Sequence, residues 1–142
     1  MTNIIPRMDT ATKNIAFMYH DDDKQWKKDL CLHLTLMRRE GLISIIEGSQ
    51  TMPQLDIIIV LISPSFMGDD KMINAIDYAL AHQEGNQRVV PILIRKVSLK
   101  GHRIERVQGL PRNGKPIDKW ASKDEALGEI SEAIRAIVEG RA

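Results

Sequence analysis

The sequence is poor in residues that build disulfides and metal sites. Cys31 is its single cysteine, so no intramolecular disulfide can form, and its four histidines are scattered without zinc-type spacing. We therefore expect neither a metal site nor a bound cofactor. This cysteine usage also favours a reducing, cytoplasmic location.

Long hydrophobic segments are absent as well. The longest apolar run, IIIVLI, is far too short to cross a bilayer, and the opening stretch MTNIIPRMDTATKN lacks the apolar centre of a signal peptide. The sequence thus predicts a cytoplasmic protein that does not associate with membranes.

The charges nearly cancel. Lys and Arg number 20 against 19 Asp and Glu, for a net charge of +1, which gives no electrostatic signature for nucleic acid or an acidic membrane. The basic run from Arg88 to Arg95-Lys96 is interpreted as solvated strand ends. The glycines follow neither GxGxxG nor GxxxxGK[ST], so nucleotide binding by those loops is not expected.

What is present fits one ordinary domain. Of the 142 residues, 43% are apolar and 27% are charged, which is typical of a globular chain. Residues 1–13 are polar and are expected to form a flexible lead-in to a domain over residues 14–140. Four apolar runs predict strands, at residues 14–20, 42–46, 55–62 and 88–94.

Two of these runs carry further information. The third, LDIIIVLI, is continuously apolar, as expected for a central strand buried on both faces. The fourth contains Pro91, which cannot donate a ladder hydrogen bond and therefore favours an edge position.

The segments between the strands carry a helical period. An amphipathic helix after the first strand is predicted to end at Gly41, with a buried stripe of Trp26, Leu30, Leu34 and Met37. A second helix is predicted over residues 71–83. A last helix begins at a Ser122–Glu125 capping box, ends at Gly140 and points Leu127, Ile130, Ile134 and Ile137 inward.

Strands that alternate with helices predict an α/β fold, a flavodoxin-like doubly wound parallel sheet of four to five strands. One connection departs from that plan. Only eight residues separate Ile46 from Leu55, whereas a helical crossover needs about 10–12 or more. In the strand order 2-1-3-4 we expect this shortened connection to be a bare loop or one short turn.

Ligands of such sheets bind beyond the carboxyl ends of the strands. The residues predicted to bind a ligand there are Tyr19, His20, Asp21, Glu47, Ser63, Phe66 and Asp70. Structural roles stay open for some of their neighbours. Asp22 or Asp23 would suit a cap of the first helix, Ser63 a simple strand end, and Trp26 the core.

The order of several motifs resembles bacterial TIR (Toll/interleukin-1 receptor-like) domains. The motifs are IAFMYHDDDKQWKKDLCLHLTLMRREGLISI, LDIIIVLISPSFM, VVPILIRK and LPRNGKPIDKWASKDEAL, and together they cover roughly residues 14–139. The resemblance implies the fold predicted above. It also implies an activity, because many bacterial TIR domains hydrolyse NAD to nicotinamide and ADP-ribose, often as the toxic output of antiphage defence.

The resemblance further implies a glutamate on the helix after the central strand. In the family it stands four residues before the Ala of an Ala-Leu pair, and here that position is Ala75. Asp77 is about 200° away around the helix and Asp70 lies more than a turn earlier, so neither is expected to replace it. Either this alanine is natural, or the chain is an engineered inactive form.

Several functions remain open. One is an NAD-hydrolysing TIR domain without its catalytic carboxylate, with NAD as the substrate. Another is a non-catalytic adaptor that associates with itself or with other TIR domains, and a fused sensor domain outside this sequence is expected for either. A phospho-receiver and a nucleoside deoxyribosyltransferase share the fold. The first would need an aspartate where Ser63 stands, and the second a glutamate like the one missing at residue 75.

Overall fold

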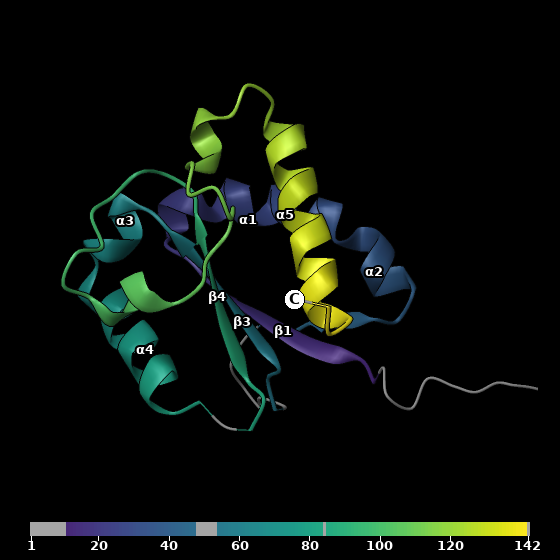
Figure 1. Cartoon of the computed structure of the whole chain (residues 1–142). Helices are drawn as coiled ribbons and strands as arrows, with labels where there is room; N and C mark the ends of the chain where they lie inside the picture. Colours follow the sequence, from purple (N-terminus) through teal and green to yellow (C-terminus); the bar gives the residue numbers. More distant parts are fainter. Residues whose placement is uncertain (1–10, 48–53, 84, 142) are drawn as a thin grey trace, which may run out of the picture.

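A computed structural model of the chain describes residues 11–47, 54–83 and 85–141, and its centre is a parallel four-stranded sheet (Figure 1). The strand order is β2-β1-β3-β4, and every neighbouring pair is parallel. The strands are β1 (Lys13–Met18), β2 (Ile43–Ile45), β3 (Ile57–Ile62) and β4 (Arg88–Leu93). The predicted flavodoxin-like fold class is confirmed.

The ends of the strands differ somewhat from the prediction. β1 begins at Lys13, inside the predicted lead-in, and ends at Met18, so Tyr19 and His20 follow the strand rather than belong to it. Residues 1–10 of the lead-in lie outside the described residues. So do residues 48–53, on which most of the predicted short connection falls.

Helices cover both faces of the sheet (Figure 1). One layer contains α1 (Lys24–His33), α2 (Thr35–Arg39) and α5 (Lys123–Val138), and the other contains α3 (Pro64–Met67) and α4 (Asp70–Ala81). Short 3-10 turns complete the chain: η2 (Asp21–Asp23), η3 (Arg103–Arg106) and η4 (Ile117–Lys119). None of the helices in the described ranges is long and apolar enough to cross a membrane.

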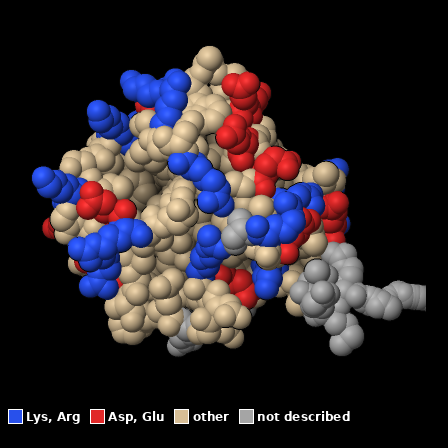
Figure 2. Space-filling model, in the orientation of Figure 1, with Lys and Arg blue, Asp and Glu red and all other residues tan. Residues whose placement is uncertain are grey.

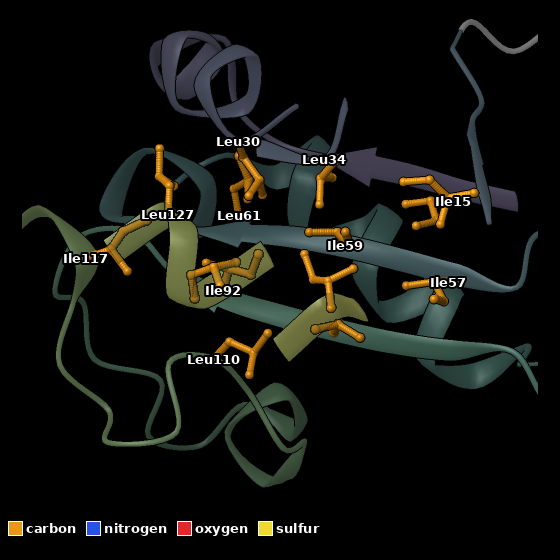
Figure 3. Packing of buried hydrophobic residues seen from close by; sticks show 14 of the residues in the cluster. Ile15, Leu30, Leu34, Ile57, Ile59, Leu61, Ile92, Leu110, Ile117 and Leu127 are labelled. Atoms are coloured by element: carbon orange, nitrogen blue, oxygen red, sulfur yellow. The ribbon is translucent and has the colours of Figure 1, made fainter. Parts of the chain in front are cut away.

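β3 supplies both layers of the core. Its six residues are at most 4% exposed and alternate between the two faces, because successive side chains of a strand point in opposite directions. Ile57, Ile59 and Leu61 pack under α1 and α5, where Figure 3 shows Leu34 close to Ile59. Ile58, Val60 and Ile62 pack under α3 and α4. The predicted central strand is confirmed.

The helical region after β1 is broken, which the sequence did not predict. It consists of η2, α1 and α2, and α1 ends where Leu34 takes φ −98° and ψ 0°. The predicted buried stripe nevertheless forms, because Leu30, Leu34 and Met37 are at most 3% exposed. Trp26 is half-buried against the same core, and Gly41 follows α2 at φ +75°, as expected for a helix stop.

The predictions for α5 and β4 are also confirmed. Ser122 accepts the N–H of Glu125 at 3.1 Å, and Leu127, Ile130 and Ile134 of α5 are buried, whereas Ile137 is half-buried. β4 is an edge strand.

Because β4 is an edge strand, Pro91 costs the sheet no hydrogen bond. The N–H of Arg88 donates to Asp56, just before β3, and that of Ile94 to Ile62 of β3. The proline nitrogen, an odd number of residues from both, therefore faces outward. Leu110 occupies that outer side, where its N–H donates to the Pro91 carbonyl and its carbonyl accepts from Leu93.

A matched pair of leucines tests this packing. Leu34→Ala should lower the free energy of unfolding by about 2–5 kcal/mol, because it empties space in a closed core. Leu36→Ala, at a side chain that is 62% exposed, should change it by less than about 0.5 kcal/mol. Urea denaturation measures both values, and equal losses would contradict the assignment of these two faces.

Candidate functional site

The carboxyl ends of β1, β3 and β4 are joined by a cluster of polar side chains, which we call the carboxyl-end cluster: Asp22, Asp23, Ser63, Ser65 and Arg95. Asp23 is 1% exposed and accepts a short hydrogen bond from the Ser63 hydroxyl. Its other carboxylate oxygen lies 3.3 Å from Nη2 of Arg95. The cluster therefore ties together the segments that follow β1, β3 and β4.

The two serines of the carboxyl-end cluster each make two hydrogen bonds. Besides donating to Asp23, the Ser63 hydroxyl accepts the N–H of Phe66 at 3.1 Å and so caps α3. The Ser65 hydroxyl donates to Asp22 at 2.9 Å and accepts from Arg95 at 3.0 Å. Ser63 thus does more than end a strand, because it ties the start of a helix to a buried carboxylate.

Two sequence interpretations need correction here. Arg95 lies at a strand end as predicted, two residues after β4, but it is not simply solvated: its side chain is 36% exposed and bonds to Asp23 and Ser65, which follow β1 and β3. Neither Asp22 nor Asp23 caps α1 through its side chain. The cap lies earlier, where Nδ1 of His20 accepts the N–H of Asp22 at 2.9 Å.

His20 also brings the start of α4 close to the end of β1. Its Nε2 lies 3.5 Å from Oδ2 of Asp69. Asp69 in turn caps α4 by accepting the N–H of Lys71 at 2.8 Å. The helix that carries residue 75 is therefore anchored beside the strand predicted to bind the ligand.

A pocket of about 230 Å³ lies beside the outer edge of β1. β2 pairs with β1 only as far as Ile45 opposite Ile15, so among the described strands the later half of β1 has a neighbour only in β3. That half and the residues around it line the pocket: Ala16, Phe17, Met18, Tyr19, Lys27, Ile46, Glu47, Leu55 and Ile58.

Lys27 is the charged group at the back of this pocket. The residue is 8% exposed, and its Nζ lies 3.0 Å from Oε1 of Glu47 and 5.7 and 5.8 Å from the ring centres of Phe17 and Tyr19. Burial by itself lowers the pKa of Lys27, but the hydrogen bond to Glu47 and nearby negative groups outweigh it, so the pKa is raised. Lys27 is therefore a cation at neutral pH.

The structure brings only two of the predicted ligand-binding residues into this pocket, Tyr19 and Glu47. Ser63 is fully buried in the carboxyl-end cluster, and Phe66 is fully buried in the core. Asp21 in η2 and Asp70 at the start of α4 are exposed, and His20 contacts Asp69 as described above. Sequence analysis missed Lys27, because the residue after a core tryptophan on a helix is by default assigned to solvent.

Ala75 is half-buried on α4 and is not among the described residues that line the pocket. Asp77 faces η3, where its Oδ1 lies 2.8 Å from Nε2 of His102. Because the two positions are about 200° apart around the helix, Ala75 faces away from η3. Asp77 is thus engaged elsewhere and does not take the place of a carboxylate at residue 75.

The chemistry available at the pocket is that of one buried cation close to two aromatic rings. Among the described residues, no group of three or more His, Cys, Asp or Glu side chains is placed to hold a metal ion. Of the described lining residues, Glu47 alone carries a carboxylate, and its side chain is 70% exposed and paired with Lys27. The arrangement suits binding of an anionic group.

Fold and pocket together define an α/β domain of flavodoxin-like topology. No protein-family model matches the chain. It is 26% identical over 140 residues to a protein of Sinorhizobium fredii (strain NBRC 101917 / NGR234) described as uncharacterized protein y4lF. The match covers 86% of this chain but 42% of that protein, so the chain spans less than half the length of the curated relative it matches.

Three aspartate substitutions test the carboxyl-end cluster. Asp23→Ala should lower the free energy of unfolding by about 1–3 kcal/mol, because the buried Ser63 hydroxyl loses its acceptor. Asp23→Asn keeps an acceptor oxygen and should lose less, and exposed Asp21→Ala should change stability by less than about 0.5 kcal/mol. Thermal and urea unfolding give these values. An unchanged free energy of unfolding in Asp23→Ala would rule out a structural role of the Asp23–Ser63 bond.

Proposed function

We propose that the chain is a TIR domain of the NAD-hydrolysing type, of the kind that acts in bacterial antiphage defence, and that Ala75 stands where the catalytic glutamate would be. The proposal is supported by the order of the motifs over residues 14–139 and by a parallel sheet of the expected topology. A pocket beside β1 that includes Tyr19 and Glu47 supports it as well. On this proposal the chain is inactive as it stands.

The observation that carries the proposal is the orientation of residue 75. Its side of α4 is turned away from η3, while Asp77 is held by His102. A longer acidic side chain at residue 75 would extend on the side of the helix away from Asp77. A methyl group leaves the position without a charge.

The missing group matters because of the bond that is broken. Cleavage between nicotinamide and ribose develops positive charge on the ribose ring, and a nearby carboxylate stabilises that charge and orients the ribose hydroxyls. The methyl group of Ala75 can accept no hydrogen bond and offers no compensating charge. Substrate would therefore bind without being hydrolysed.

Restoring the carboxylate tests the activity. Ala75→Glu should release nicotinamide from NAD at a rate at least about a hundredfold above that of Ala75→Gln, which has the same length without the charge. Chromatographic quantification of nicotinamide at high protein and NAD concentrations measures both. Equal rates in the two variants would remove the enzymatic proposal.

A second candidate function, a non-catalytic interaction module, is favoured by the surface charges. The segment between β4 and α5, residues 95–119, contains eight basic and two acidic residues. Seven of the basic side chains are exposed and form no ion pair with described residues: Lys96, Lys100, Arg103, Arg106, Arg112, Lys115 and Lys119. Figure 2 shows Lys and Arg gathered over this segment and Asp and Glu over the first part of α5.

A groove of about 330 Å³ lies at this boundary, and its charged lining residues are Arg112, Arg141 and, from α5, Glu129 and Glu132. A surface divided in this way complements a second copy of itself. Leu32 and Leu36, 71% and 62% exposed, add apolar area on the α1 and α2 layer. The relative extends well beyond the matched region, which supports a further domain, such as a sensor, in longer proteins of this type.

Charge reversal tests the interaction module. If the chain self-associates through the divided surface, Arg112→Glu and Glu129→Arg should each reduce association, and the two variants mixed together should associate again. Light scattering and sedimentation at low and high salt measure this, with Lys28→Glu as a control of equal charge change. A chain that stays monomeric at every concentration would contradict this candidate.

A further inference from the structure

We propose that the pocket beside β1 binds the phosphate-bearing half of a nucleotide ligand, with Lys27 as the phosphate-binding cation and Glu47 as an internal anion that the ligand displaces. This inference rests on the proposed function in one respect, because NAD is the ligand it specifies. The anion-binding role of Lys27 itself is independent of any hydrolysis.

The first argument is that the ammonium group of Lys27 is incompletely bonded. An ammonium carries three donors, and among the described residues Glu47 is its one hydrogen-bond acceptor, at 3.0 Å. The rings of Phe17 and Tyr19, at 5.7 and 5.8 Å, stabilise the charge but accept no strong hydrogen bond. Two donors are thus left for a ligand that presents several oxygens, as a phosphate does.

The second argument is the unequal exposure of the two partners. The Lys27 side chain is 11% exposed and the Glu47 side chain is 70% exposed. A displaced Glu47 carboxylate would be hydrated at little cost, whereas Lys27 cannot leave the pocket and needs an anion beside it. Exchange of Glu47 for a ligand phosphate therefore keeps the buried cation paired throughout.

The third argument is the shape and chemistry of the walls. Apart from Lys27 and Glu47, the described residues of the lining are apolar or aromatic, which suits a base or ribose next to the charged group. Tyr19 packs against one core layer and Ile58 belongs to the other. The volume of about 230 Å³ is below the roughly 300–1,000 Å³ of pockets that enclose a whole drug-sized ligand. It therefore fits one part of a dinucleotide rather than the whole molecule.

Two substitutions with opposite effects test this inference on the full chain, which is not expected to consume NAD. Lys27→Met should weaken binding of ADP-ribose by about tenfold or more, because a charge-assisted contact is lost. Glu47→Gln should strengthen the same binding several-fold, because the competing anion is gone. Isothermal titration calorimetry measures both, with Lys28→Met as an exposed control of equal charge change.

A purely structural Lys27–Glu47 pair makes a different prediction. Both substitutions would then lower the unfolding temperature. The affinity for ADP-ribose would not fall in Lys27→Met and rise in Glu47→Gln. If Lys27 binds phosphate, nicotinamide riboside, which has no phosphate, should bind the Lys27→Met variant as well as it binds the unsubstituted chain. If Lys27→Met does not fold, an unchanged affinity in Glu47→Gln is sufficient to overturn the inference.

Inorganic pyrophosphate separates this inference from the proposed function. Pyrophosphate binding that depends on Lys27, without NAD or ADP-ribose binding, would support the anion site and count against the NAD proposal. NAD binding that is unaffected by Lys27→Met would support the proposed function and overturn this inference. If none of the three ligands binds at millimolar concentration, the inference is wrong.

Discussion

The structure depends on the burial of β3 on both faces. Six consecutive apolar residues leave no solvent-facing side, so the strand is stable only in the middle of a sheet with helices above and below. Parallel pairing with β1 on one side and β4 on the other then brings the carboxyl ends of all three strands to one edge. The carboxyl-end cluster owes its position to that arrangement.

At that edge the polar side chains of the carboxyl-end cluster bond to one another. Asp23 is too deeply buried to be hydrated, so it takes the Ser63 hydroxyl and the Arg95 guanidinium as partners. These bonds lie at the carboxyl edge of the sheet, where open α/β sheets commonly bind ligands. The pocket described for this chain lies beside the outer edge of β1, where β2 ends early and Lys27 is part of the lining.

Much of the fold could be predicted from sequence because it rests on local patterns. The continuous run of β3, the stripe through Leu30 and Leu34 and the stop at Gly41 are each visible within a dozen residues. The site was less predictable. Arg95 meets Asp23 only because β4 and β1 both neighbour β3, a relation between residues 72 positions apart in the chain. Lys27 lies close to the rings of Phe17 in β1 and of Tyr19 just after it, which no helical period predicts. The break at Leu34 escaped prediction for the opposite reason, because an unbroken apolar stripe conceals a change in backbone direction.

The edges of the sheet limit how the molecule can aggregate. On β4, Pro91 presents no outward donor and Leu110 already holds the neighbouring outward groups, while β2 at the other margin is three residues long. Pairing of a strand from another molecule along β4 is therefore disfavoured, which leaves side-chain contacts, sensitive to charge and salt, as the main way to associate there.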